Sequence, residues 1–151
     1  RLGRGGEKRI HDHIDHFGIG GAIPIHGGSR VAIFSTGAIF EEIAGAETIL
    51  AGHGVHPAVR TFPTVKPIDR ETIIRCAKEF DLIVTVEEHN LSGGFGSAVA
   101  EVLAELPVHA RLLRVGLHDT YSAIVGNQNY LRAQFGLDAA GIAKKILEVL
   151  E

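Results

Sequence analysis

Cysteine and methionine are almost absent from this chain of 151 residues, which has one cysteine, Cys76, and no methionine. A single cysteine excludes an internal disulfide and predicts a reducing compartment, which we take to be the cytoplasm. Because the sequence starts at Arg1 without an initiating methionine, we expect it to be a fragment of a longer polypeptide.

Long apolar runs and an excess of one charge are also missing. No apolar run approaches the roughly 20 residues that span a bilayer, and the polar N-terminus lacks the apolar centre of a signal peptide. The formal net charge is −3, so no basic field favours nucleic acid or an anionic membrane. We therefore expect no nucleic-acid partner and no membrane partner. With 45% hydrophobic and 22% charged residues, the chain has the composition of an ordinary globular domain.

Short apolar runs alternate with one-sided helical patterns from Ser29 onward. The runs predict strands at residues 31–35, 55–62, 82–86 and 111–115, and the patterns predict helices at 37–50, 70–80, 97–106, 130–135 and after Asp138. Residues 22–25 add an edge strand, since Pro24 cannot donate to a central ladder. This alternation predicts an α/β fold: a three-layer α/β/α domain with a mostly parallel sheet of about five strands and an antiparallel edge strand near the N-terminus.

Some side chains in these elements have predicted positions. Asp69 and Asp138 precede helical patterns and are expected to cap them. Cys76 lies between apolar residues and is expected in the core. The first helix should turn one stripe inward, formed by Ile39, Ile43, Ala46, Ile49 and Leu50.

Residues 1–28 are the least domain-like part of the chain. They begin basic and glycine-rich, which predicts a linker or the tail of an upstream domain, so the folded domain should span residues 29–151. A metal site at His11, His13 and His16 is possible because imidazole is a common ligand. We favour a solvated polar segment, since no cysteine or outer-shell pattern accompanies these histidines.

The stretch 81–106 carries the most distinctive polar residues. A buried strand is followed by two carboxylates, a histidine and a glycine turn, and then by a helix. Polar groups at the C-terminal end of a strand, beside a helix N-terminus, are where α/β proteins usually place ligand or partner contacts. The candidate loop for an interface or an anion therefore consists of Glu87, Glu88, His89, Asn90, Gly93, Gly94 and Gly96.

The glycine turn has two interpretations. Its backbone N–H groups could hold a phosphate, but the dinucleotide fingerprint needs a small residue where Val99 stands, and no Walker lysine follows. The alternative is that the glycines let the helix and strand pack closely. In that case Gly94→Val should destabilise the fold by about 1–3 kcal/mol.

The polar residues before the turn do not favour a direct catalytic role. Adjacent strand residues face opposite sides, so Glu87 and Glu88 should not form a general acid–base pair, although one of them could accept N–H groups from the turn and lock it. His89 could transfer protons or serve at an interface, and we favour structural or interface use. A serine nucleophile is unsupported because GxSxG is absent.

Several motifs resemble the C-terminal domain of the transketolase superfamily. TVEEHNLSGGFGSAVAEVLAE is similar to a strand, EEH-type turn, GG-x-G-S run and helix of 1-deoxyxylulose-5-phosphate synthases and two-piece transketolases. RVAIFSTG, TVKPIDRETI, RVGLHDTY and FGLDAAGIAKKI resemble other segments of that domain in the same order. RLGRG resembles the end of the preceding pyrimidine-binding domain, so residues 1–28 would be its tail and the linker. The chain is identified as a member of this superfamily, nearest the two-piece and synthase types.

The resemblance implies the C-terminal domain of a thiamine-diphosphate-dependent transketolase, which moves two-carbon ketol units between sugar phosphates. In such enzymes thiamine diphosphate and Mg²⁺ sit between two other domains. This chain is therefore expected to bind no cofactor or metal, to hold no catalytic residue and to be inactive alone. Its role would be packing on the preceding domains, in the same or a separate chain, and on a homodimer mate.

Three alternatives stay open. The chain could be the C-terminal domain of a 2-oxo acid dehydrogenase beta subunit or of a deoxyxylulose-phosphate synthase. It could also be a free-standing module that binds an anionic metabolite through the glycine turn. The chain also departs from family members of the two-piece type, which usually have proline where His118 stands and a Gly-Glu-Ser-Gly-like run where this chain has residues 122–126, so the role of that loop is open.

Overall fold

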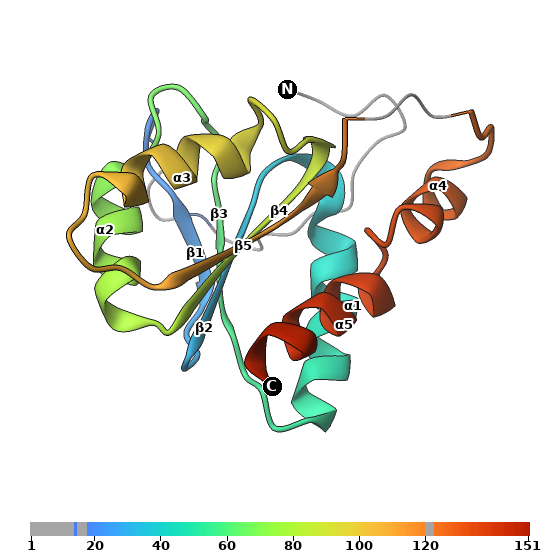
Figure 1. Ribbon diagram of the computed structural model, residues 1–151, viewed down its shortest axis with the longest axis horizontal. Helices are drawn as coiled ribbons and strands as arrows, with labels where there is room; N and C mark the ends of the chain where they lie inside the picture. Colours follow the sequence, from blue (N-terminus) through green and yellow to red (C-terminus); the bar gives the residue numbers. More distant parts are fainter. Residues whose placement is uncertain (1–13, 15–17, 120–122) are drawn as a thin grey trace.

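The structure is a computed structural model that describes residues 14, 18–119 and 123–151. These residues form one five-stranded sheet with helices on both faces (Figure 1). The predicted three-layer α/β fold is confirmed. His11, His13 and His16 lie outside the described residues. Among the described residues, no helix has both the length and the apolar character needed to cross a membrane.

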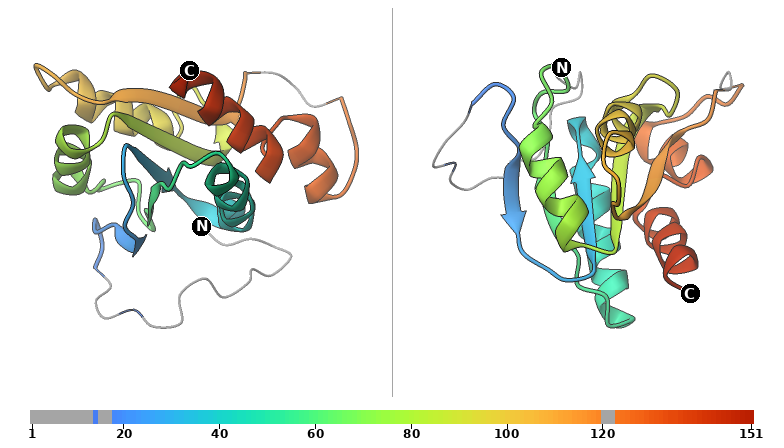
Figure 2. Two further views of the ribbon diagram at one scale, coloured as in Figure 1. Left: turned by 90° about the horizontal axis from the view of Figure 1, so that it is seen from below. Right: turned by 60° about the vertical axis from the view of Figure 1, so that its left-hand side comes forward.

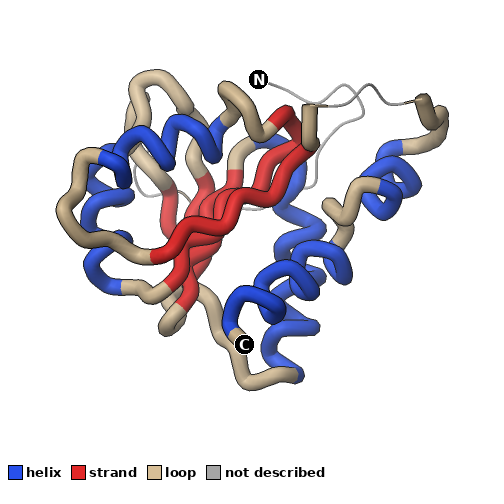
Figure 3. Tube along the Cα trace, in the orientation of Figure 1, coloured by secondary structure: helices blue, strands red, loops and turns tan. Residues whose placement is uncertain are grey.

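The strand order is β1-β3-β2-β4-β5. Figure 3 shows the strands of this sheet with helices on either side. Strands β2, β3, β4 and β5 are parallel, and β1 is antiparallel to β3 at one edge. The edge position of β1 is the one predicted from Pro24, and it lies within the part of the chain predicted as a linker. The bounds are β1 Ile23–His26, β2 Val31–Ser35, β3 Ala58–Thr61, β4 Leu82–Asn90 and β5 Arg111–Leu117.

Two strand predictions need correction. Strand β4 does not end at Val86 but continues through the two glutamates to Asn90, which pairs with Leu117 of β5. It continues because Glu87 and Glu88 each accept hydrogen bonds on their own face of the sheet. Strand β3 begins at Ala58, three residues later than predicted.

The helices form two layers. A short 3-10 helix, η1, leads into α1, and α1 and α5 lie side by side on one face of the sheet (Figure 2). Helices α2 and α3 cover the other face. The bounds are η1 Gly37–Ile39, α1 Phe40–Gly52, α2 Arg70–Glu79, α3 Phe95–Ala104, α4 Gln128–Gln134 and α5 Ala139–Leu150.

Alternation along the central strands supplies both apolar layers. In β2, Val31 and Ile33 face α1 and α5, whereas Ala32 and Phe34 face α2 and α3. Cys76 lies in the second layer as predicted, and burial raises the pKa of its thiol.

One predicted core residue is wrong. Ile49 is exposed, because the inward stripe of the first helix passes through its neighbour Leu50 and leaves Ile49 to one side. The other four residues of the predicted stripe are buried.

The Asp69 carboxylate joins two parts of the fold. As predicted, it caps α2, because its Oδ1 accepts from the Thr72 N–H at 2.9 Å. Its Oδ2 accepts from the Ala22 N–H at 2.8 Å, which ties the segment before β1 to α2. Burial acts to raise the pKa of Asp69, but these hydrogen bonds outweigh it and hold the pKa below its ordinary value.

We expect Asp69→Ala to lower the free energy of unfolding by about 1 kcal/mol at neutral pH. Because the pKa of Asp69 is lower in the folded chain than in the unfolded one, its contribution is present above about pH 4 and is lost as pH falls through the folded value. Urea unfolding of wild type and variant at about pH 7 and about pH 3 should therefore show a gap that narrows on acidification. An equal gap at both values would contradict this assignment.

Candidate functional site

The connections of the sheet reverse direction between β2 and β4. After β2 the chain crosses to β3 on one side, and after β4 it crosses to β5 on the other. In open α/β sheets, the crevice outside the carboxyl ends of two such strands is the usual ligand site. The candidate loop begins at the carboxyl end of β4, so it lies beside this crevice.

Glu87 points from β4 toward the start of α3 and is buried. Its Oε2 accepts from the Phe95 N–H at 2.6 Å, and its Oε1 accepts from the Gly96 N–H at 2.7 Å. Gly94, the N-cap of this helix, has no side chain for that task. The carboxylate therefore satisfies two unpaired N–H groups and complements the positive end of the helix dipole. The prediction that one glutamate locks the turn is confirmed, and it is Glu87.

The glycines of the turn permit this close approach. A Cβ added to Gly94 would lie 2.3 Å from the Asn90 carbonyl oxygen and 2.3 Å from Glu87 Oε2, and one added to Gly96 would lie 2.6 Å from Thr85 Oγ1. Gly93 has a φ of +73°, which side chains rarely adopt. The close-packing interpretation therefore accounts for the glycines. The N–H groups that a phosphate would need are already taken by Glu87.

We expect Gly94→Val to lower the free energy of unfolding toward the upper end of about 1–3 kcal/mol, because the added atoms meet backbone and a buried carboxylate. A matched control is Gly52→Val at the end of α1, where an added Cβ meets nothing within 4 Å. Thermal melts of both variants beside wild type would test the difference. Equal midpoints for the two variants would argue against close packing at Gly94.

Glu88 points to the opposite face, as predicted from the alternation of the strand. There it meets Arg132 of α4, whose Nε donates to Oε1 at 2.8 Å and whose Nη2 donates to Oε2 at 2.9 Å. The same guanidinium donates to Glu42 Oε1 at 3.2 Å and to the Ala38 carbonyl at 3.1 Å. Hydrogen bonding to Glu88 is the main reason that the pKa of Arg132 is raised. Because Ala38 follows β2 and Glu88 lies near the end of β4, the Arg132 guanidinium bridges the carboxyl ends of these two strands.

Glu42 extends this network to the C-terminal helix. Its Oε2 accepts from the Ala139 N–H at 3.0 Å, at the start of α5. Arg132 is only 6% exposed, so the charges lie largely away from water. Glu42 and Arg132 were not among the predicted site residues. The signal for Arg132 is its isolation, since it is the only charged residue between Asp119 and Asp138.

His89 and Asn90 stand apart from both carboxylate contacts. His89 is exposed, and its Nδ1 lies 3.2 Å from the Asn90 carbonyl oxygen. Among the described residues, the candidate loop is therefore divided into a clamp at Glu87, an ion-pair network at Glu88 and a surface histidine. The arrangement organises backbone and helices.

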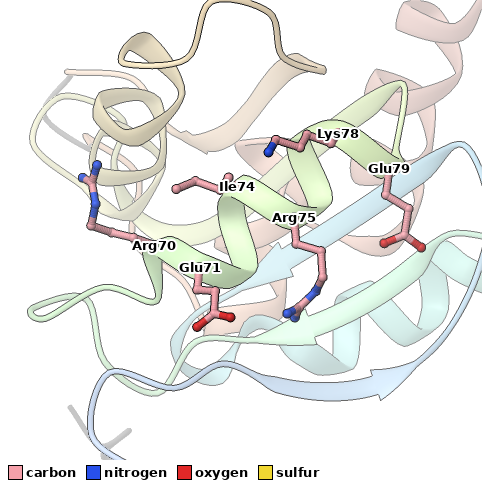
Figure 4. Close-up of a pocket in the computed structure, with 6 residues that line it drawn as sticks. All are labelled: Arg70, Glu71, Ile74, Arg75, Lys78 and Glu79. Carbon is pink, nitrogen blue, oxygen red and sulfur yellow. The ribbon is translucent and has the colours of Figure 1, made fainter.

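A hollow of about 650 Å³ lies elsewhere, on the outer side of α2 (Figure 4). All of its lining residues come from that one helix, and they mix both signs of charge. Because the lining residues all come from one helix, the hollow is an open helix surface and does not resemble an enclosed ligand site. Its lining consists of Arg70, Glu71, Ile74, Arg75, Lys78 and Glu79.

Comparison with known proteins gives consistent matches. The family described as "Transketolase, C-terminal domain" matches residues 20–142. The 1-deoxy-D-xylulose-5-phosphate synthase of Syntrophotalea carbinolica is 40% identical over 135 residues, covering 89% of this chain and 21% of that protein. A 6-deoxy-6-sulfo-D-fructose transketolase subunit of Clostridium sp. (strain MSTE9) is 40% identical over 152 residues, covering 100% of this chain and 46% of that protein.

A solved structure described as a split gene transketolase, inactive beta4 tetramer, superposes with a TM-score of 0.81 at 29% identity. The match covers 95% of this chain and 45% of that chain. The chain thus spans about a fifth of the synthase and just under half of each transketolase subunit to which it is similar.

Proposed function

Because the chain belongs to the transketolase C-terminal domain family, we propose that it is the C-terminal domain of a thiamine-diphosphate-dependent transketolase-type enzyme and that it is inactive alone. The parent enzyme would transfer a two-carbon ketol unit between sugar phosphates. One observation carries the proposal. Among the described residues, two places that often receive a ligand in such folds are occupied by the chain's own side chains, Glu87 at the start of α3 and Arg132 at the carboxyl ends of β2 and β4.

Thiamine diphosphate and Mg²⁺ would be held by other parts of the parent enzyme, where the cofactor supplies the carbanion chemistry. The described residues of this chain do not fit them. In the described part of the chain, no three His, Cys, Asp or Glu side chains gather as a metal site. The N–H groups of Phe95 and Gly96, which would suit a diphosphate, already hold the Glu87 carboxylate.

The proposed role is packing on the preceding domains and on a second copy of the parent subunit, in the cytoplasm. Support comes from relatives that are themselves subunits, such as an apulose-4-phosphate transketolase subunit from Actinobacillus succinogenes, 33% identical over 140 residues. The tetrameric state in the description of the solved neighbour supports association between copies. The missing domains could lie on the same polypeptide or on another.

Calorimetric titration of the folded chain with thiamine diphosphate and Mg²⁺ tests the proposal. We expect no saturable heat and no ketol transfer by the chain alone. Saturable binding or turnover would overturn the proposal that other parts of the parent enzyme bind the cofactor and carry out catalysis. Gly93–Gly96 would then be the first segment to mutate. A parallel titration with inorganic phosphate tests the anion-module alternative, against which stands the use of the Phe95 and Gly96 N–H groups by Glu87.

A deoxyxylulose-phosphate synthase is the second candidate for the parent enzyme. The 40% identity to the Syntrophotalea carbinolica synthase favours it. Exchanging this domain into that synthase and into the Clostridium subunit would separate the two candidates, because the matching parent should retain more of its own activity. A 2-oxo acid dehydrogenase beta subunit remains an alternative that the same exchange could include.

A further inference from the structure

The two edges of the sheet differ in how readily they can pair with another strand. At the β1 edge, Pro24 has no N–H to offer, and the register with β3 shifts between Pro24 and His26. The opposite edge is β5, which lies at the front of the sheet in Figure 1. Between Arg111 and Arg114 it has no proline, and its only pairing among the described residues is with β4. This part of β5 is therefore the edge to which another strand could be added.

The backbone of β5 presents free hydrogen-bonding groups along this edge. The Arg111 N–H donates to the Asp81 carbonyl at 3.0 Å, so the odd-numbered residues of the strand face β4. In a parallel strand the backbone groups of successive residues alternate between its two sides. The N–H and C=O groups of Leu112 and Arg114 therefore point outward from the edge. We find no hydrogen-bond partner for these groups among the described residues, and an extended peptide pairs with groups of this kind.

Two partly exposed leucines border the open groups. Leu112 packs with the layer of α2 and α3, and Leu113 packs with the layer of α1 and α5. Neither leucine is fully buried, whereas their partners on the interior strand β4, Ile83 and Val84, are 0% exposed. An added strand would cover both leucines, one on each face of the sheet, so pairing would also bury apolar area.

Two exposed arginines indicate the charge of the partner. Arg111 donates to the Val149 carbonyl at 2.9 Å. Arg114 donates to the Leu91 carbonyl at 3.3 Å and to Ser97 Oγ at 3.2 Å. All of these acceptors are neutral, and in the part of the chain that the structure describes neither arginine has a carboxylate within ion-pair distance. The edge is therefore basic and can still pair with carboxylates.

The spacing of the arginines specifies the partner further. A second copy of this edge would add arginines to arginines, and like charges on neighbouring strands are unfavourable. Because Arg111 and Arg114 are three residues apart, their side chains lie on opposite faces of the sheet. The occupant that fits is an extended segment with two carboxylates at the same spacing, one on each face.

We propose that the Arg111–Arg114 edge of β5 is a docking site for an extended acidic peptide segment of another domain or chain, which adds to the five-stranded sheet as a further strand. Backbone hydrogen bonds to Leu112 and Arg114 supply the affinity, and ion pairs with the two arginines select acidic sequences.

A fluorescent peptide tests this docking site. The probe is the acetylated peptide TVEVTEVT, whose two glutamates are three residues apart, and its control is TVKVTKVT. At about 50 mM salt, where screening is weak, we expect fluorescence anisotropy to show saturable binding of the glutamate peptide to the chain. The lysine peptide should bind at least about tenfold more weakly. With the glutamate peptide bound, the amide hydrogens of Leu112 and Arg114 should exchange more slowly, which locates the contact without any variant.

Reversing one charge should reverse the preference. Arg114→Glu should bind the glutamate peptide at least about tenfold more weakly than wild type and the lysine peptide more tightly. The matched control is Lys66→Glu, in the loop after β3, where the side chain is exposed. It changes the net charge equally, lies beyond β2 and β4 from this edge, and should bind both peptides like wild type.

A backbone variant separates pairing from charge alone. Leu112→Pro removes an outward N–H, which an edge strand tolerates because no ladder bond is lost. Leu112→Ala removes the same leucine contacts but keeps the N–H. We expect Leu112→Pro to bind the glutamate peptide at least about tenfold more weakly than Leu112→Ala.

Three outcomes would overturn the proposal. They are no saturable binding of the glutamate peptide up to about 1 mM, equal affinity for the two peptides, and unchanged amide exchange at Leu112 and Arg114. The charge reversal and the exchange measurement decide the question even where Leu112→Pro does not fold. None of these results alters the titration with thiamine diphosphate and Mg²⁺, so failure of this docking site and failure of the proposed function are distinguishable.

Discussion

Replacing Arg132 by methionine is expected to lower the free energy of unfolding by about 3–5 kcal/mol. The substitution keeps an unbranched side chain of similar length but removes the cation, which leaves Glu88 and Glu42 facing each other without it. It also removes the hydrogen bond that Arg132 donates to the Ala38 carbonyl. Chemical denaturation by urea, followed by circular dichroism, measures the change.

Two further variants serve as controls for this prediction. Arg132→Lys keeps the charge but cannot form the two-pronged contact with Glu88, so its loss should be intermediate. Arg30→Met removes the cation of an exposed pair with Asp81 and should cost at most about 1 kcal/mol. If Arg132→Met lost no more stability than Arg30→Met, the network would not be what fixes α4.

Glu87→Ala should cost about 2–6 kcal/mol, because two buried N–H groups lose their acceptor and each costs about 1–3 kcal/mol. The variant leaves a small space between two donors at the positive end of α3. Formate is an anion of suitable size to enter it. We therefore expect formate to raise the melting midpoint of Glu87→Ala more than that of wild type.

The controls for this experiment address charge and salt. Glu105→Ala removes an exposed carboxylate paired with Arg70 and should show neither the loss nor the formate effect. Sodium chloride at equal ionic strength separates specific filling from screening. A Glu87→Ala variant as stable as wild type would mean that the clamp contributes little to the fold.

Local patterns were sufficient for the order and class of the elements. Asp69 and Asp138 mark the starts of α2 and α5 because a short acidic side chain can accept from the first turn of a helix, and both caps are present. Alternating strands and helices leave few topologies, since parallel strands need helical crossovers. The family motifs lie in these same segments, and the family match over residues 20–142 confirms the identification.

Long-range polar contacts were the part that could not be predicted. Arg132 is 44 residues from Glu88 and 90 from Glu42, and a local pattern does not say which distant charges will meet. For the same reason the predicted end of β4 was wrong. Two consecutive carboxylates usually end a buried strand, but here Glu87 finds the start of α3 and Glu88 finds Arg132. The clamp itself could be foreseen only as one of two possibilities, because alternation does not tell which face of the strand carries α3.

The Glu87 clamp also makes the stability of this domain independent of free phosphate ligands. A domain that uses a helix N-terminus to bind phosphate is stabilised by mass action, so its folded fraction rises and falls with the concentration of free ligand. Here the anion is covalently part of the chain, and its effective concentration at the helix is constant. The folded fraction should therefore not change with the concentration of free phosphate compounds around the domain, which suits the packing role proposed above.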